Sequence, residues 1–73
     1  MNFVELLKIH KKLKVRLWCG PQDFVGVVGT VSENCVCLET VYYNAVNRTF
    51  LRTDRIDAIE EVKELSKNGP QSP

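Results

Sequence analysis

The sequence has no long apolar run, no marked excess of one charge and only one histidine. Its apolar stretches fall far short of the roughly 20 residues that a membrane-spanning helix needs, so we expect no membrane segment and no membrane partner. Ten basic residues stand against nine acidic ones, which gives a net charge of +1. A chain so nearly neutral has no overall basic field that would draw it to nucleic acid or to an anionic membrane.

Groupings typical of catalytic and metal sites are also missing. No Ser-His-Asp, Cys-His, paired-carboxylate or phosphate-loop arrangement occurs at usable spacing, so we expect no enzyme, no catalytic residue and no cofactor. Cys35 and Cys37 share one face of an expected strand and cannot easily bridge each other. With His10 they still lack the second ligand pair of a structural zinc site, so we expect no metal. An odd number of cysteines and no signal peptide favour a reducing, cytoplasmic location.

The chain is short, with 73 residues. A domain of this size removes only about 60% of its unfolded surface from water, so it gains from oligomerisation where disulfides and metals are absent. We expect one domain over residues 1–63. Residues 64–73 include Gly69, Pro70 and Pro73, and the tail from Ser66 has no apolar residue, which predicts disorder there.

The N-terminal residues have the pattern of a short amphipathic helix over residues 2–11. Asn2 is followed three residues later by Glu5, which resembles a capping box. Four residues spaced three and four apart form the expected covered stripe: Phe3, Leu6, Leu7 and His10. Lys8, Lys11 and Lys12 are expected in solvent.

The remainder predicts a mainly β fold of five antiparallel strands. Alternation and turn residues give strands over 13–18, 24–31, 35–43, 48–53 and 56–62, with a hairpin at 44–47. The last segment also has helical spacing, since Ile56, Ile59 and Val62 lie three apart, and we expect a strand there because the segment is short. Gly20 predicts a tight turn. Gly26, inside the second strand, predicts a strong bend or the close approach of another backbone.

Two motifs stand out in the β part of the sequence. The first combines alternating apolar residues with a turn glycine, an aromatic residue, a strand glycine and a polar loop: Val15, Leu17, Gly20, Phe24, Gly26, Val28, Ser32, Glu33, Asn34, Val36 and Leu38. The second is the stretch from Leu51 to Ile56. Together they resemble the two motifs of the Sm and Sm-like family, which includes bacterial Hfq, although Thr53 stands where the family has glycine. The resemblance covers roughly residues 13–62 and implies a strongly bent open barrel of the SH3 type.

The resemblance also implies a function. It predicts a cyclic homo-oligomer of about six or seven subunits, in which the fourth strand of one pairs with the fifth strand of the next. It further predicts that single-stranded RNA binds near a central pore. The loop residues that fill those places are Ser32, Glu33, Asn34, Arg52 and Thr53, and repeated copies of Lys8, Lys11 and Lys12 would form a basic collar.

Other interpretations of the same residues remain open. Glu33 and Asp54 would repel phosphate, so the chain could instead be a protein-interaction or structural oligomer that has lost RNA binding. Arg52 could pair with neighbouring acids, and Asn34 could serve only as a turn former. Tyr42 and Tyr43 point to opposite faces of a strand, so at most one should be buried, with the other free to stack on a base or lie at a subunit interface.

Overall fold

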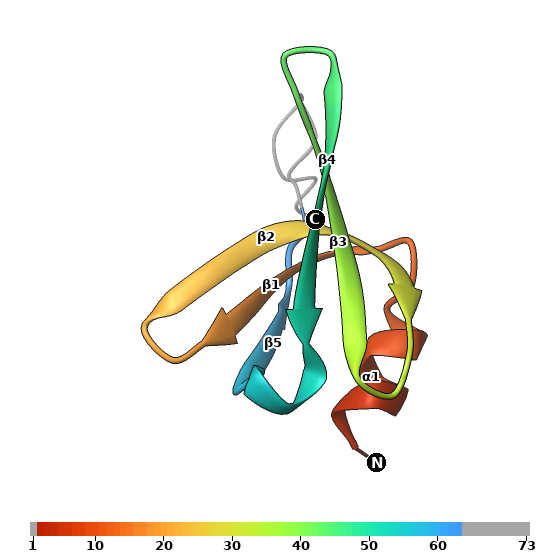
Figure 1. The fold of residues 1–73 in the computed structure, drawn as a ribbon, viewed down its shortest axis with the longest axis vertical. Coiled ribbons are helices and arrows are strands. Elements are labelled where there is room, and N and C mark those ends of the chain that lie inside the picture. Colours follow the sequence, from red (N-terminus) through yellow and green to blue (C-terminus); the bar gives the residue numbers. More distant parts are fainter. Residues whose placement is uncertain (1, 64–73) are drawn as a thin grey trace, which may run out of the picture.

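The computed structural model describes residues 2–63. One helix, five strands and a short 3-10 helix follow one another: α1 (Phe3–Ile9), β1 (Lys14–Cys19), β2 (Gln22–Val31), β3 (Cys35–Tyr42), β4 (Ala45–Arg52), η1 (Thr53–Arg55) and β5 (Ala58–Glu61) (Figure 1). The expected mainly β fold, with a helix before five antiparallel strands, is confirmed. The expected disordered tail, residues 64–73, lies outside the described residues.

The N-terminal helix begins with the capping box that the sequence predicts. The Glu5 backbone N–H donates to Asn2 Oδ1 at 2.9 Å, and the Asn2 N–H donates to the Glu5 carboxylate at 3.4 Å. The helix ends at Ile9, earlier than expected, and Lys12 then adopts a left-handed φ of 71°. Leu7 and His10 are buried, as the apolar stripe predicts. The helix therefore covers one end of the sheet's apolar face.

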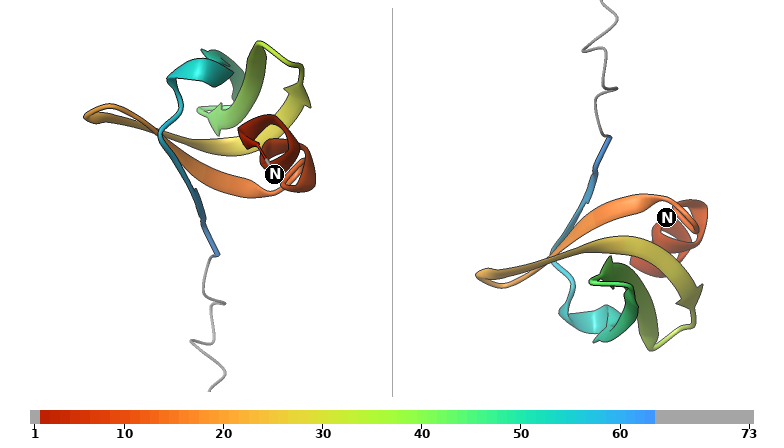
Figure 2. Two further views of the ribbon diagram at one scale, coloured as in Figure 1. Left: turned by 90° about the horizontal axis from the view of Figure 1, so that it is seen from below. Right: turned by 90° about the horizontal axis from the view of Figure 1, so that it is seen from above.

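The sheet has the strand order β4-β3-β2-β1-β5, and every pairing is antiparallel. β2 is the longest strand: it pairs with β1 from Gln22 to Val27 and with β3 from Val27 to Val31, with an irregularity between Val28 and Val31. In the views of Figure 2 this strand passes along β1 and then curves around toward β3. β2 thus joins the two halves of the sheet.

The buried core lies on one face of this sheet. Its members come from α1, from the three strands β1, β2 and β3, and from the residue directly after η1: Leu7, Val15, Leu17, Val28, Val36, Leu38 and Ile56. The alternating buried positions of β1, Val15 and Leu17, confirm the period-two pattern expected there. Cys37 is also buried, whereas Cys19 and Cys35 are half-buried, and all three thiols are free.

Gly26 lies where the β3 backbone comes unusually close to β2. A Cβ atom built on Gly26 would be 2.9 Å from the carbonyl oxygen of Glu39 and 3.3 Å from the Cβ of Leu38. This confirms the close approach that a glycine within the strand predicts. Gly20 has a φ of +63° in the turn between β1 and β2, so it supplies the left-handed backbone that the turn needs.

Several predicted strand boundaries are wrong. The second strand begins at Gln22 and not at residue 24, so the turn before it is shorter than expected. The expected hairpin at 44–47 is instead a two-residue turn at Tyr43 and Asn44, which have φ values of 51° and 64°. Asparagine tolerates positive φ, and such turns match the twist of paired strands, so β4 begins earlier, at Ala45. Thr53 belongs to η1 and not to the fourth strand. The fifth strand is confirmed over its alternative helix but covers only Ala58–Glu61.

The sheet is open. Within residues 2–63 no pairing joins β4 to β5, so each of these strands has one free edge. The β3–β4 hairpin extends away from η1 and α1 to the far end of the molecule (Figure 1). No helix in this part of the chain is long and apolar enough to cross a membrane.

Candidate functional site

The β2–β3 loop and the start of η1 are held together by two hydrogen bonds from Thr53. Its Oγ1 donates to the carbonyl oxygen of Glu33 at 2.7 Å, and its backbone N–H donates to the carbonyl oxygen of Asn34 at 3.0 Å. Thr53 is buried, so these bonds are largely shielded from water. The β2–β3 loop and η1, which are 20 residues apart in sequence at this contact, therefore form one surface.

Four of the eight predicted RNA-binding residues meet on that surface, with Ser32 next to them. Asn34 and Glu33 are exposed loop residues, and Arg52 is the last residue of β4, directly before Thr53. The Ser32 backbone N–H and hydroxyl both donate to the carbonyl oxygen of Cys35, at 2.8 and 3.2 Å. Ser32 thus stabilises the loop, while the side chains of Asn34 and Arg52 are exposed to solvent.

Arg52 has an acidic partner of its own. Its guanidinium donates to the Asp54 carboxylate at 2.8 Å, and both side chains are about two-thirds exposed. This confirms the local pairing that the sequence leaves open. Because an exposed ion pair contributes little, roughly 0 to 1 kcal/mol, a phosphate group could compete for the guanidinium. Glu33 and Asp54 nevertheless make this surface mixed in charge.

The other three predicted RNA-binding residues are the lysines Lys8, Lys11 and Lys12, near the N-terminal helix. Lys8 is on α1, and Lys11 and Lys12 follow it, with Lys11 opposite Val28 in a parallel bridge and the Lys12 N–H donating to the Val28 carbonyl at 2.8 Å. All three residues are exposed. In Figure 1, α1, the β2–β3 loop and η1 share the lower end of the molecule. The helix that carries Lys8 therefore lies at the same end as the loops, whereas Lys11 and Lys12 lie in the connection to β1, beside Val28 of β2.

The aromatic end of β3 is more exposed than expected. Tyr42 and Tyr43 are both solvent-exposed, and their rings meet edge to face with centroids 4.5 Å apart. Sequence reasoning missed three further exposed apolar residues: Val41 and Val46, which pair with each other next to the tyrosines, and Phe50, which lies farther along β4 opposite Cys37. Trp18 is partly exposed and donates from Nε1 to Glu60 at 2.8 Å.

His10 connects α1 to β5. Its Nδ1 lies 2.8 Å from the carbonyl oxygen of Leu6, which can only accept, and its Nε2 lies 2.8 Å from the Glu61 carboxylate. An imidazolium satisfies both contacts as a double donor. The hydrogen bond to the Leu6 carbonyl, and then the one to Glu61, raise the pKa of His10 above its ordinary value, although burial acts in the opposite direction. His10 thus links the end of α1 to β5.

We expect the stability of the fold to depend on pH through His10. Because its folded-state pKa is raised, its contribution is fully present below the ordinary value near 6.5 and is lost as the pH rises through the higher folded-state value. Urea unfolding at about pH 5.5 and about pH 8.5 should therefore give a lower free energy of unfolding at the higher pH. His10→Gln should remove most of that difference, whereas Glu60→Gln, one residue from the carboxylate that His10 contacts, should keep it. An unchanged pH dependence in His10→Gln would contradict this role.

The remaining reactive groups form no second site. Among residues 2–63, the histidine, cysteine and acidic side chains form no cluster of three or more that could hold a metal ion. Burial is the main cause that raises the pKa of the Cys19 thiol, and the nearby charge of Asp57 is the second. Little of this thiol is therefore present as the reactive thiolate. The surface formed by Asn34, Arg52 and Thr53 is the strongest candidate for binding.

No known protein family, curated protein or solved structure matches this chain.

Proposed function

We propose that this chain is an Sm-like protein with an open five-stranded sheet, which forms rings and binds single-stranded RNA without catalysing a reaction. The observation that carries the proposal is the junction of the β2–β3 loop with η1 through Thr53. It gives one surface on which an arginine, an asparagine and loop carbonyls are available to a single strand. The helix followed by strands in the order β4-β3-β2-β1-β5 is compatible with that family.

The chemistry of the surface suits unpaired nucleotides. Asn34 offers both a donor and an acceptor to the edge of a base, and Arg52 can form charge-assisted hydrogen bonds with a phosphate or stack on a base. Lys8, Lys11 and Lys12 would contact phosphates farther along the strand. In a ring of about six or seven subunits these groups repeat, so weak contacts in each copy would add up along one RNA chain.

The free edges support assembly. Each unpaired edge strand exposes backbone N–H and C=O groups that seek partners, and pairing β4 of one subunit with β5 of the next satisfies both edges. One interface repeated by rotation closes a ring. Native mass spectrometry should therefore find a cyclic homo-oligomer, and a chain that stays monomeric at micromolar concentration would overturn this half of the proposal.

RNA binding is tested with Arg52→Ala. Fluorescence anisotropy with U-rich and A-rich oligonucleotides at two salt concentrations should show binding by the wild type that weakens with salt. Arg52→Ala should weaken binding at least about tenfold, since a hydrogen bond to a charged group contributes about 1.5–3 kcal/mol.

The matched control is Arg48→Ala. Arg48 lies on the same strand and also pairs with one acid, Glu39, at 3.1 Å, but it is four residues nearer the hairpin. Its removal should leave RNA affinity within about twofold of the wild type. Equal losses in the two variants would indicate nonspecific attraction, and no salt-dependent binding by the wild type would refute the RNA function.

The Arg52–Asp54 pair favours a second candidate function, a protein-interaction or structural oligomer. A protein that bound this surface would meet Arg52 already neutralised by Asp54, beside the exposed Glu33. A pull-down that recovers a protein partner and no RNA would select this alternative.

A further inference from the structure

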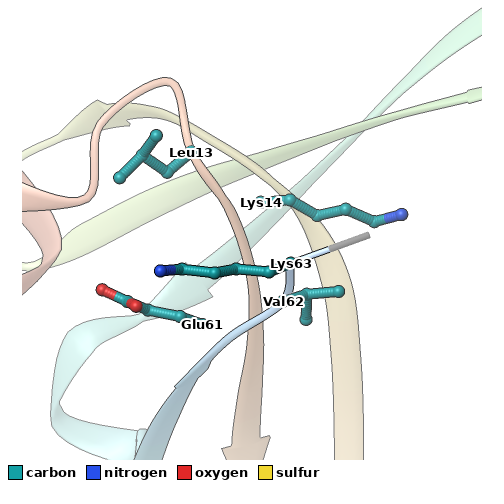
Figure 3. A pocket seen from close by; sticks show the side chains of 5 residues that line it. All are labelled: Leu13, Lys14, Glu61, Val62 and Lys63. Carbon is teal, nitrogen blue, oxygen red and sulfur yellow. The ribbon is translucent and has the colours of Figure 1, made fainter. Parts of the chain in front are cut away.

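Two hollows in the surface differ in the chemistry of their walls. The one beside β5 has a volume of about 230 Å³ and is lined by Leu13, Lys14, Glu61, Val62 and Lys63 (Figure 3). It is smaller than the roughly 300 Å³ at which small-molecule sites begin. In Figure 3 the side chains of Leu13 and Val62 lie on opposite sides of the strands, so one ligand could not contact both. This hollow therefore indicates no ligand.

The second hollow lies between the β1–β2 turn and the segment that joins β4 to β5. It has a volume of about 460 Å³, which is within the range of ligand sites. Its walls include Cys19, Gln22, Asp54, Arg55 and Asp57. We call it the turn hollow. Four of these five residues have polar side chains, so the turn hollow suits a polar ligand.

Asp57 is held in the turn hollow by two hydrogen bonds to the β1–β2 hairpin. The Gly20 N–H donates to Asp57 Oδ2 at 2.7 Å, and the Asp57 N–H donates to the Trp18 carbonyl oxygen at 2.7 Å. The other carboxylate oxygen, Oδ1, has no hydrogen-bond partner within residues 2–63. Because a carboxylate only accepts hydrogen bonds, a ligand must bring donors to Asp57.

Arg55 supplies the opposite charge. Within residues 2–63 its exposed guanidinium takes part in no ion pair or hydrogen bond, whereas the other three arginines each have an acidic partner. Burial is the main influence on the pKa of the Cys19 thiol, and the charges of Asp57 and Arg55 act on that pKa in opposite directions, so both charges lie near this thiol. A free guanidinium binds anions well, phosphate groups among them. The matching ligand therefore carries an anionic group and, on another part, hydrogen-bond donors.

Guanine is the RNA base whose donors match Asp57. Its Watson–Crick edge presents two adjacent donors, N1–H and the N2 amino group, and a carboxylate can accept from both. Uracil presents a single N–H there, and adenine and cytosine each present one amino group beside an acceptor. Proteins read single-stranded RNA on these edges. A guanosine nucleotide thus offers donors to Asp57 and a phosphate to Arg55.

The turn hollow adjoins the surface formed by Asn34, Arg52 and Thr53. Asp54 contributes to the wall of the hollow, and its carboxylate accepts from the Arg52 guanidinium at 2.8 Å. Arg52 directly precedes η1, and Arg55 is the last residue of η1. An RNA strand held at Arg52 can therefore continue into the turn hollow.

We propose that the turn hollow binds one guanine nucleotide of the RNA strand that Arg52 holds, with the base edge on Asp57 and a phosphate on Arg55. This contact rests on the proposed RNA binding and adds the base that the protein selects. It also accounts for an arginine and a carboxylate oxygen that have no partner within the described part of the chain.

The first test changes the RNA and leaves the protein native. A uridine oligonucleotide with one central guanosine is compared with the same strand carrying uridine there, or inosine, which lacks the N2 amino group. In fluorescence anisotropy the wild type should bind the guanosine strand at least about fivefold more tightly than either of the others, the lower end of the discrimination from a two-donor base contact. Equal affinity for the three strands would overturn the proposal.

The second test changes Asp57. Asp57→Asn keeps an oxygen that accepts from the Gly20 N–H but replaces the other oxygen with an amide donor, so its affinities for the three strands should lie within about twofold of one another. Asp23→Asn is the matched control. It makes the same change of charge in the β1–β2 hairpin, on a side chain that pairs with Arg16 at 3.4 Å outside the turn hollow, and it should keep the preference for guanosine.

Circular dichroism and urea unfolding show whether both variants keep the fold. A guanosine preference that survives in Asp57→Asn, or is lost equally in Asp23→Asn, would contradict the role of Asp57. If Asp57→Asn does not fold, the inosine comparison with the wild type still decides the question.

Thiol labelling locates the guanine on the protein. Cys19 lines the turn hollow, whereas Cys35 lies opposite Arg52 in the β3–β4 pairing. With the RNA saturating, the guanosine strand should slow the reaction of Cys19 with iodoacetamide more than the inosine strand does, while Cys35 should react alike with both, because alkylation depends on access to the thiol. Peptide mass spectrometry separates the two sites. Equal protection of Cys19 by the two strands would place the guanine elsewhere and overturn the proposal.

The remaining outcomes separate this proposal from the RNA binding on which it rests. If the wild type binds none of the strands in a salt-dependent way, the proposed function fails and the guanine contact fails with it. If Arg52→Ala weakens binding but guanosine brings no gain in the wild type, the proposed function stands and the guanine contact is wrong. Guanosine monophosphate that bound as tightly as the guanosine strand would show that the hollow serves a free nucleotide, which would also overturn the proposal.

Discussion

Gly26→Ala is expected to lower the free energy of unfolding by about 2–3 kcal/mol, the upper part of the range for inserting a carbon atom into a well-packed site. The new Cβ would lie 2.9 Å from the carbonyl oxygen of Glu39, 3.1 Å from a methyl group of Thr40 and 3.3 Å from the Cβ of Leu38. The nearest of these atoms belongs to backbone. It cannot rotate away as the end of a side chain can, so β2 and β3 must separate where they cross.

Gly29→Ala is the matched control, on the same strand. A Cβ there would have its nearest neighbour, the Cys37 carbonyl oxygen, at 3.5 Å, an ordinary contact distance. Because alanine also loses less conformational freedom on folding than glycine, this variant should be neutral or slightly more stable, by up to about 1 kcal/mol. Urea unfolding of the two variants measures the difference. Equal effects at the two positions would show that β3 does not constrain β2 at Gly26.

The comparison of these two glycines shows what sequence can and cannot predict in this fold. Both lie in a valine-rich strand. The pattern predicts a long second strand, which is confirmed, and at Gly26 either a strong bend or a close approach, of which the close approach is observed. The number of strands and their succession along the chain followed from alternation and turn residues. How much room each glycine leaves for a Cβ atom depends on how β3 crosses β2, and the local sequence around Gly26 or Gly29 does not contain that information.

The boundaries around β4 were harder to predict for a similar reason. Asn44 and Asn47 are both turn formers, and only the pairing of Tyr42 with Ala45 decides that the turn is at Tyr43 and Asn44. The early start of β4 lengthens the hairpin and exposes its apolar tip. The pairing of β3 with β4 therefore determined the shape of the tip, which the turn-forming residues alone did not reveal.

The candidate site, too, could be predicted only in part from the sequence. The resemblance to the Sm pattern predicts which loop residues form the site, whereas the hydrogen bonds from Thr53 to Glu33 and Asn34 are visible only in the folded chain. Thr53 occupies the position at which the Sm pattern has glycine, and its hydroxyl makes a bond that glycine could not. A residue that departs from the motif thus stabilises the surface to which the motif points.

Leu7→Ala is expected to lower the free energy of unfolding by about 2–5 kcal/mol, the range for truncating a buried leucine. Leu7 is completely buried and is the one buried side chain within the described helix α1, where it joins the central core cluster. A helix of 7 residues is not stable by itself in water, so packing through Leu7 holds it in place. For a chain of 73 residues, total stability is about 4–11 kcal/mol, and the loss could exceed half of it.

Ile9→Ala provides the control for Leu7 because it removes a similar side chain from the same helix. Ile9 is 59% exposed, so the change should alter stability by less than about 0.5 kcal/mol. Circular dichroism with urea unfolding measures both effects, and a comparable loss in the two variants would contradict the packing role of Leu7. Loss of α1 also breaks the His10–Glu61 contact at β5. Leu7→Ala should therefore show a weaker pH dependence of stability than the wild type, whereas Ile9→Ala should retain it.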